Sequence, residues 1–234
     1  GGVGNTTLTQ YVYKEVEGYF DVKIWVCVSL NFNVYRLTEE IAKSISDVSE
    51  LDEVKRNPDK LIVRRLKHKK FLLVLDDMWN CGNEDEWNKF LVPFRKEQKK
   101  GSIILVTTRF PGLAEMVKTS DCPIPLEGLG HDMFWRLFLL YVFGDEQSGT
   151  DHSDLLETGE KIVKKLKGSP LAAKTVGKLL RNRLDLDHWT RVLESKEWEL
   201  QSGEHDIMPA LKLSYDYLPF HLQQCFTYCA LFPE

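Results

Sequence analysis

Residues 71–75, with the sequence FLLVL, constrain the fold of this chain more than any other segment. All five are apolar, and two aspartates, Asp76 and Asp77, follow them directly. A short, continuous apolar run is typical of a strand inside a parallel sheet whose two faces are covered by helices. We therefore expect a layered α/β fold, with this strand in the sheet and the aspartates at its carboxyl end.

Other segments extend the predicted sheet. Residues 22–28 read as a half-buried strand, residues 102–107 repeat the apolar pattern, and residues 123–126 form a shorter candidate strand. Apolar residues at helical spacing lie between them, over residues 8–16, over 37–48 and from 58 onward. Strands that alternate with helices at such intervals predict βαβ units and a doubly wound parallel sheet.

The pattern changes near residue 128, where the strand signals stop and helices dominate. Helical patterns cover residues 134–143, 154–166, 170–180, 208–217 and 218–229. A further shift falls near residue 204. We therefore predict domain boundaries near residues 128 and 204.

Composition excludes several classes of protein. Hydrophobic residues make up 43% and charged residues 28% of the 234 positions, which are globular averages and exclude collagen, coiled coil and disorder. The apolar runs are shorter than the roughly 18 residues of a membrane helix. The net charge of −4 lacks the excess of basic residues that is typical of a nucleic-acid binder. The five cysteines do not have the spacing of a disulfide framework, which indicates a reducing compartment.

The glycine-rich start of the chain carries the first chemical signal. The segment GGVGNTT at residues 1–7 matches the second half of G-x-x-x-x-G-K-[ST], a loop whose backbone N–H groups converge on phosphates at a helix N-terminus. The first glycine of the pattern would precede Gly1 by two residues, and Asn5 stands at the position of the lysine. An ordinary turn before a helix is the alternative interpretation.

The two aspartates supply what phosphate chemistry on such a loop needs. One carboxylate holds Mg²⁺ and the second orients or deprotonates the attacking water, while Thr6 is the hydroxyl expected on the metal. Taken alone, Asp76 and Asp77 could equally cap a helix. Arg109 ends another strand at the same edge of the sheet, where a guanidinium could sense a terminal phosphate.

Five segments in this order resemble the NB-ARC domain of plant disease-resistance receptors, across essentially the whole chain. They are residues 20–29, 72–79 (LLVLDDMW), 101–109 (GSIILVTTR), 168–172 (GSPLA) and 211–234, which ends CFTYCALFPE. Trp79 and the segment WVCVS at residues 25–29 resemble the non-TIR, coiled-coil branch of the family.

The resemblance implies a P-loop NTPase fold in three parts. Residues 1–128 would form the nucleotide-binding α/β subdomain. Its first strand would precede Gly1 and lie between the strands at residues 103–107 and 123–126, so that the strand at 103–107 is paired on one side only. Residues 129–204 would form a helical bundle, and residues 205–234 the beginning of a winged-helix subdomain. The implied activity is a switch, inactive with ADP and activated by exchange for ATP, with slow ATP hydrolysis in the intact family.

The resemblance also assigns roles to individual residues. Asp77 would be the catalytic carboxylate, and Thr6 and Asp76 would hold Mg²⁺. Contacts with ADP or ATP would come from Gly1, Gly2, Val3, Gly4, Asn5, Thr6, Thr7, Arg109, Pro170 and Leu171. Pro170 would pack against adenine, although a proline in the first turn of a helix is also ordinary. Ser169 stands where the family usually has leucine, a mild loss of packing.

The implied partners are the nucleotide and the coiled-coil and leucine-rich-repeat regions of a longer receptor, with oligomerisation on activation and neither membrane segment nor nucleic acid. The implied location is the cytoplasm, with the nucleus as a second location. Asn5 removes a positive charge from the phosphate site, which weakens binding and transition-state stabilisation. The alternative is therefore a scaffold of the same fold that has lost nucleotide exchange and hydrolysis.

Three further features have simpler interpretations. His221, Cys225 and Cys229 share one helical face, which favours a buried core seam over a zinc site because no fourth ligand is near. The basic run at residues 67–70 is typical of a solvated helix end. Trp189 and Trp198 are expected in the core rather than in a ligand cage.

A DNA-binding regulator is disfavoured by the acidic charge and the lack of a basic recognition helix.

Overall fold

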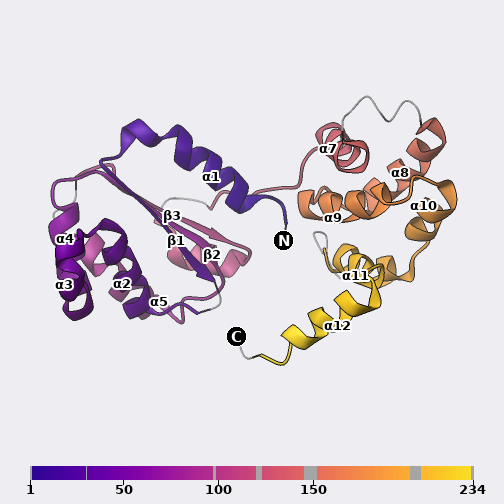
Figure 1. The fold of residues 1–234 in the computed structure, drawn as a ribbon. Helices are drawn as coiled ribbons and strands as arrows, with labels where there is room; N and C mark the ends of the chain where they lie inside the picture. Colours follow the sequence, from indigo (N-terminus) through magenta and orange to yellow (C-terminus); the bar gives the residue numbers. More distant parts are fainter. Residues whose placement is uncertain are drawn as a thin grey trace. The chain divides into compact units, whose positions relative to one another are not determined.

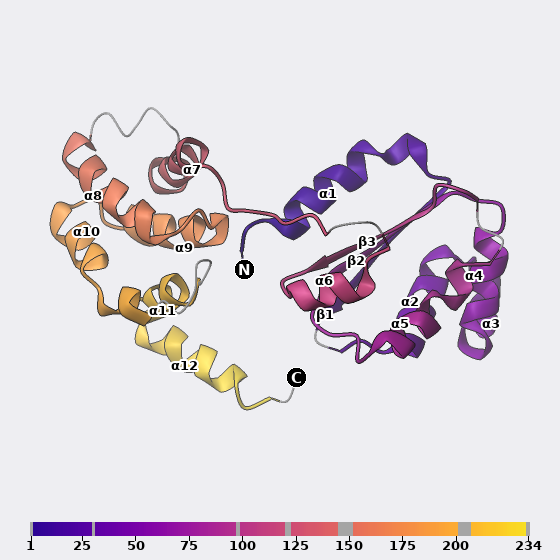
Figure 2. The same cartoon turned by 180° about the vertical axis from the view of Figure 1, so that it is seen from behind.

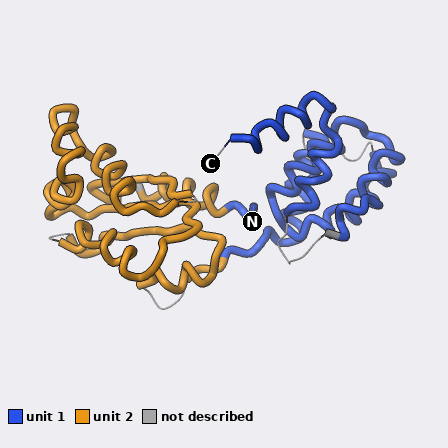
Figure 3. Tube along the Cα trace, turned by 90° about the horizontal axis from the view of Figure 1, so that it is seen from below, with its two compact units in different colours: residues 1–4, 126–234 blue, residues 5–125 orange. Residues whose placement is uncertain are grey.

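A computed structural model describes residues 2–29, 31–96, 99–119, 123–144, 152–200 and 207–232. The chain divides into two compact units, residues 5–125 and residues 1–4 with 126–234, which Figure 3 colours separately. The predicted boundary near residue 204 falls in residues 201–206, outside the described part of the chain.

The first unit is built on a parallel sheet of three described strands in the order β1-β2-β3. The strands are β1 (Val22–Ser29), β2 (Phe71–Met78) and β3 (Ile103–Thr108). β2 lies in the middle, with Val22 opposite Phe71 on one side and Leu72 opposite Ile103 on the other. The three predicted strands are therefore confirmed, although Asp76 and Asp77 lie inside β2 rather than after it.

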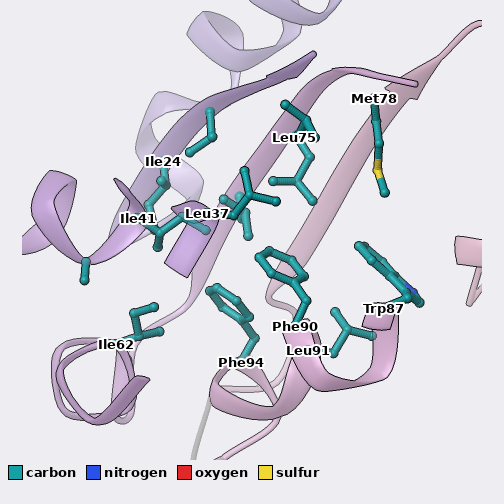
Figure 4. Packing of buried hydrophobic residues seen from close by; sticks show 14 of the residues in the cluster. Ile24, Leu37, Ile41, Ile62, Leu75, Met78, Trp87, Phe90, Leu91 and Phe94 are labelled. Carbon is teal, nitrogen blue, oxygen red and sulfur yellow. The ribbon is translucent and has the colours of Figure 1, made fainter. Parts of the chain in front are cut away.

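Helices cover both faces of this sheet, as the continuous apolar run in β2 predicted (Figures 1 and 2). The helices are α1 (Asn5–Glu15), α2 (Val34–Ile45), α3 (Leu51–Arg56), α4 (Pro58–Leu66), α5 (Glu84–Leu91) and α6 (Pro111–Val117), with short 3-10 turns at η1 (Glu17–Tyr19), η2 (Val48–Glu50) and η3 (Val92–Phe94). Leu73 and Leu75 belong to the same buried core as Leu37 of α2 and Phe90 of α5. Figure 4 shows this core from close by, with Leu75 and Phe90 labelled. Leu72 and Val74 line an apolar cavity of about 170 Å³ together with Val12 of α1.

The predicted strand at residues 123–126 is wrong. Residues 123–130 are irregular, and Ile124 is 85% exposed. β3 pairs only with β2 among the described residues, as expected, and residues 123–126 make no ladder with its other edge. A short apolar pattern becomes a strand only when a neighbour satisfies its backbone groups.

The second unit is helical. It contains α7 (His131–Phe143), α8 (Ser153–Lys165), α9 (Pro170–Arg181), α10 (Leu186–Leu193), η5 (Lys196–Leu200), α11 (Met208–Asp216) and α12 (Phe220–Cys229). Trp189 and Trp198 are buried, as predicted. Gly177 lets α9 approach α7, because an added Cβ would lie 2.8 Å from the Cβ of Tyr141.

The predicted seam on α12 is not buried. His221, Cys225 and Cys229 are exposed, and no residue of α12 is buried within the described chain. A helical stripe becomes a seam only against a partner, and here α12 has polar contacts with α11, such as Gln223 Nε2 donating to the carbonyl of Tyr215 at 3.1 Å. The described residues contain no group of three metal-binding side chains.

The structure also bears on the basic run after α4 and on membrane-spanning helices. Lys67, His68 and Lys69 are exposed directly after α4, as expected of a solvated helix end. Among the described residues, none of the helices combines the length and apolar character that crossing a bilayer requires.

Candidate functional site

The glycine-rich loop contains two residues in a conformation that favours glycine. Gly2 has φ +77° and Gly4 has φ +101°, both in the left-handed region. A Cβ on Gly4 would meet nothing within 4 Å, so the loop is open there, whereas a Cβ on Gly2 would lie 2.8 Å from the Cβ of Leu171. Val3 lies between them and is half-buried, and Gly1 lies outside the described residues.

The start of α9 belongs to the same unit as this loop. The carbonyl of Gly2 accepts a hydrogen bond from the Leu171 N–H at 3.2 Å and another from the Ser169 hydroxyl at 3.3 Å. Ser169 also caps the helix by accepting from the Ala172 N–H, and Pro170 occupies its first turn. The Ser169 hydroxyl thus makes hydrogen bonds to both the loop and the helix.

In the other unit, α1 begins at Asn5, directly after the loop. Asn5 Nδ2 donates to the carbonyl of Thr108 over a long 3.5 Å, and its Oδ1 is buried without a hydrogen-bond partner in the described structure. The first turn of α1 holds no acidic side chain, and both Thr6 and Thr7 are exposed there. A helix N-terminus of this kind suits an anion.

The Asp76 carboxylate is held by two threonines. Thr6 donates to its Oδ1 at 3.0 Å, and Thr107 of β3 donates to the same oxygen at 2.6 Å. Asp76 is only 5% exposed. Because Asp76 lies two residues after Val74, regular alternation along β2 places it on the face that α1 covers, which explains why a residue of α1 reaches it.

A bulge in β2 brings the second aspartate to the same threonine. Leu75 pairs with Val106 and Met78 with Thr108, so Asp76 and Asp77 together oppose Thr107. Asp77 has φ +52°, and its N–H donates to the Thr107 hydroxyl at 2.9 Å. Thr107 therefore bonds both aspartates, a role that sequence reasoning missed because it depends on this cross-strand register.

Arg109 is bonded to Asp77. Its Nε and Nη2 lie 3.3 Å from Oδ1 of Asp77, and its guanidinium lies 4.3 Å from the centre of the Trp79 ring. Both partners of the ion pair are partly exposed, the Arg109 side chain at 45% and the Asp77 side chain at 36%. The predicted phosphate sensor and the predicted catalytic carboxylate are thus each other's partners.

The donor set fits Mg²⁺. A threonine hydroxyl and a carboxylate converge at Thr6 and Asp76, and Mg²⁺ in phosphate sites typically takes one or two such oxygens together with phosphate oxygens and water. A lysine that could reach the phosphates is missing from the pattern, because Asn5 occupies its position.

Comparison with known proteins identifies the fold family. A family model described as the NB-ARC domain matches residues 1–148. The chain belongs to the NB-ARC family. NB-ARC domains bind nucleotides, and the parallel sheet flanked by helices on both faces is the α/β architecture expected of such a P-loop NTPase.

Similar proteins come from plants. The putative disease resistance protein RGA1 of Solanum bulbocastanum is 39% identical over 236 residues, and the putative disease resistance RPP13-like protein 1 of Arabidopsis thaliana is 37% identical over 244 residues. Each alignment covers 100% of this chain but only 24% and 22% of the respective relative. This NB-ARC chain therefore spans less than a quarter of the length of these relatives.

Proposed function

We propose that this NB-ARC chain is an ADP/ATP-binding switch within a plant immune receptor. The observation that carries the proposal is the Thr6–Asp76–Thr107 cluster, in which a hydroxyl from the helix after the glycine-rich loop bonds the buried carboxylate of the central strand. This is the pairing of hydroxyl and carboxylate that a P-loop nucleotide site uses to hold its metal.

The proposed roles follow the chemistry of each group. The backbone N–H groups of the loop and of the first turn of α1 bind the phosphates, and Thr6 and Asp76 hold Mg²⁺, which neutralises phosphate charge when bound. Asp77 orients the attacking water in a slow hydrolysis, and Arg109 senses the terminal phosphate. Contacts with the adenine are proposed for Pro170 and Leu171.

The parts and setting of the receptor are also proposals. Residues 1–128 would be the nucleotide-binding subdomain, residues 129–204 the helical subdomain and residues 205–234 the start of a winged-helix subdomain. The chain would work in the cytoplasm, with the coiled-coil and leucine-rich-repeat regions of the receptor as partners and with oligomerisation after activation. The length of the relatives, more than four times this chain, supports a larger protein around it.

A second candidate rests on Asn5. Without the lysine, the same fold could serve as a scaffold that neither exchanges nor hydrolyses nucleotide. Calorimetry with ADP on the wild type and on Asn5→Lys separates the two. A switch weakened at one contact predicts that Asn5→Lys tightens ADP binding at least about tenfold, because it restores a charge-assisted hydrogen bond. Equal affinities would reject this explanation.

The role of Asp77 has its own test. In the Asn5→Lys background, Asp77→Ala should lower ATP turnover while sparing ADP affinity, because a carboxylate that acts on water does not contact the diphosphate. The matched variant Asp76→Ala should weaken Mg²⁺-dependent binding instead. Lost ADP affinity with unchanged turnover in Asp77→Ala would show that the roles of the two aspartates are exchanged.

A further inference from the structure

Trp79 lies where two neighbouring strands end. Met78 of β2 pairs with Thr108 of β3, so the residues that follow them, Trp79 and Arg109, emerge side by side. The guanidinium of Arg109 lies 4.3 Å from the centre of the Trp79 ring. The ring of Phe110 packs against Trp79 at 5.9 Å with an interplanar angle of 60°. The tryptophan is thus held between its own strand end and the residue after Arg109.

The guanidinium that lies over the Trp79 ring is also bonded to a carboxylate. Arg109 gives Nε and Nη2 to the carboxylate of Asp77, at 3.3 Å to Oδ1 and at 3.4 Å from Nη2 to Oδ2. A planar guanidinium binds a carboxylate and a phosphate through the same fork of donors. Stacking on an aromatic ring fixes the plane of that fork, and tryptophan is the strongest aromatic partner of a cation.

We propose that Trp79 is a positioning residue that holds the plane of the Arg109 guanidinium while Arg109 exchanges the carboxylate of Asp77 for the terminal phosphate of ATP. The proposal rests on the function proposed above, since it requires a nucleotide at this site. Trp79 itself contacts neither phosphate nor water in this scheme, and it acts through Arg109.

The exposure of the pair makes such an exchange feasible. The side chains of Arg109 and Asp77 are 45% and 36% exposed. Because exposed ion pairs are weak, a doubly charged terminal phosphate can displace the carboxylate of Asp77 from Arg109. Once Arg109 moves to the phosphate, the Asp77 carboxylate is free to accept a hydrogen bond from water. Arrival of the terminal phosphate and release of the catalytic carboxylate are then one event, which ADP cannot trigger.

The test compares the affinities for a non-hydrolysable ATP analogue and for ADP. Trp79→Leu should lower the affinity for the ATP analogue about two- to fivefold, the strength of one exposed cation–π contact, and leave ADP affinity unchanged. Trp79→Phe should recover part of the loss. The matched control is Trp25→Leu on β1, which removes a tryptophan that contacts Tyr13. It should change neither the affinity for the ATP analogue nor the affinity for ADP. A merely structural role would lower both affinities together.

A second measurement needs no nucleotide. In the ¹⁵N–¹H spectrum of the free protein, the Arg109 Nε–H signal should carry a ring-current shift that Trp79→Leu abolishes and Trp25→Leu retains. An unchanged signal in Trp79→Leu overturns the stacking, and an equal loss for both nucleotides overturns the positioning role.

If the wild type binds neither nucleotide, the proposed function fails together with the exchange. If it binds both and only the ATP-specific loss is missing, this inference alone fails.

Discussion

Replacing Thr107 with valine tests the cluster that ties the two aspartates together. The change keeps the shape of the side chain and removes only its hydroxyl, which accepts from the Asp77 N–H at 2.9 Å and donates to Asp76 at 2.6 Å. Asp76 is 5% exposed, so water has little access to replace the lost donor. Among the described residues, the hydrogen bond that remains to the Asp76 carboxylate is the one from Thr6.

The expected magnitude follows from these two bonds. A hydrogen bond to a charged group contributes about 1.5–3 kcal/mol and a neutral one about 0.5–1.5 kcal/mol, so Thr107→Val should lower the free energy of unfolding by about 2–4 kcal/mol. Urea denaturation followed by circular dichroism measures this difference. Thr107→Ser, which keeps the hydroxyl, should recover most of the loss.

The neighbouring threonine provides the control. The Thr108 hydroxyl accepts a solvent-exposed hydrogen bond from the Phe110 N–H at 3.1 Å, and Thr108 is half-buried like Thr107. Thr108→Val should therefore change the free energy of unfolding by no more than about 0.5–1 kcal/mol. Equal destabilisation by the valine substitutions at 107 and 108 would refute the argument that Thr107 is the shared partner of the aspartates.

Two further predictions concern packing and reactivity. Gly177→Ala should destabilise the helical unit by about 1–3 kcal/mol because the new methyl group would meet the Cβ of Tyr141, whereas Gly112→Ala, with nothing within 4 Å, should leave urea denaturation unchanged or slightly improved. Cys81 is fully buried, and burial together with the charge of Glu86 raises the pKa of its thiol, so it should react with a maleimide at pH 7 far more slowly than the exposed Cys27. Similar rates for the two thiols, measured by mass spectrometry of labelled peptides, would contradict the described packing.

Local patterns in the sequence predicted the main elements of the sheet, because apolar alternation and runs depend on neighbouring residues alone. They could not predict which segments find partners. The segment at residues 123–126 is apolar enough for a strand but has no described neighbour, and the stripe that includes Cys225 lies exposed although its spacing favours burial. Burial and pairing are tertiary properties that one segment does not encode.

The same limit applies to the candidate site. Motif spacing predicted the loop, the aspartates and Arg109, because each lies at a position that the pattern of a phosphate site defines. The contacts between these groups could not be predicted from the sequence. The Thr107 hydroxyl, the Arg109–Asp77 pair and the Trp79 ring meet through the register of β2 against β3, which includes a bulge that no local pattern signals.

Relative to β3, the bulge makes Asp77 an extra residue of β2, whereas the register with β1 is unbroken, with Cys27 opposite Asp76 and Ser29 opposite Met78. With unbroken alternation, the core that receives Leu73 and Leu75 would next receive Asp77, yet that core receives Met78. The alternation of core-facing side chains therefore skips Asp77, while Asp76 keeps the position that regular alternation gives it. Two consecutive carboxylates can therefore share one buried strand without inverting its apolar face. Asp76 thus keeps the regular alternation of β2, whereas Asp77 is the residue that β3 leaves unmatched, and its side chain, 36% exposed, places a solvent-accessible carboxylate at the bulge.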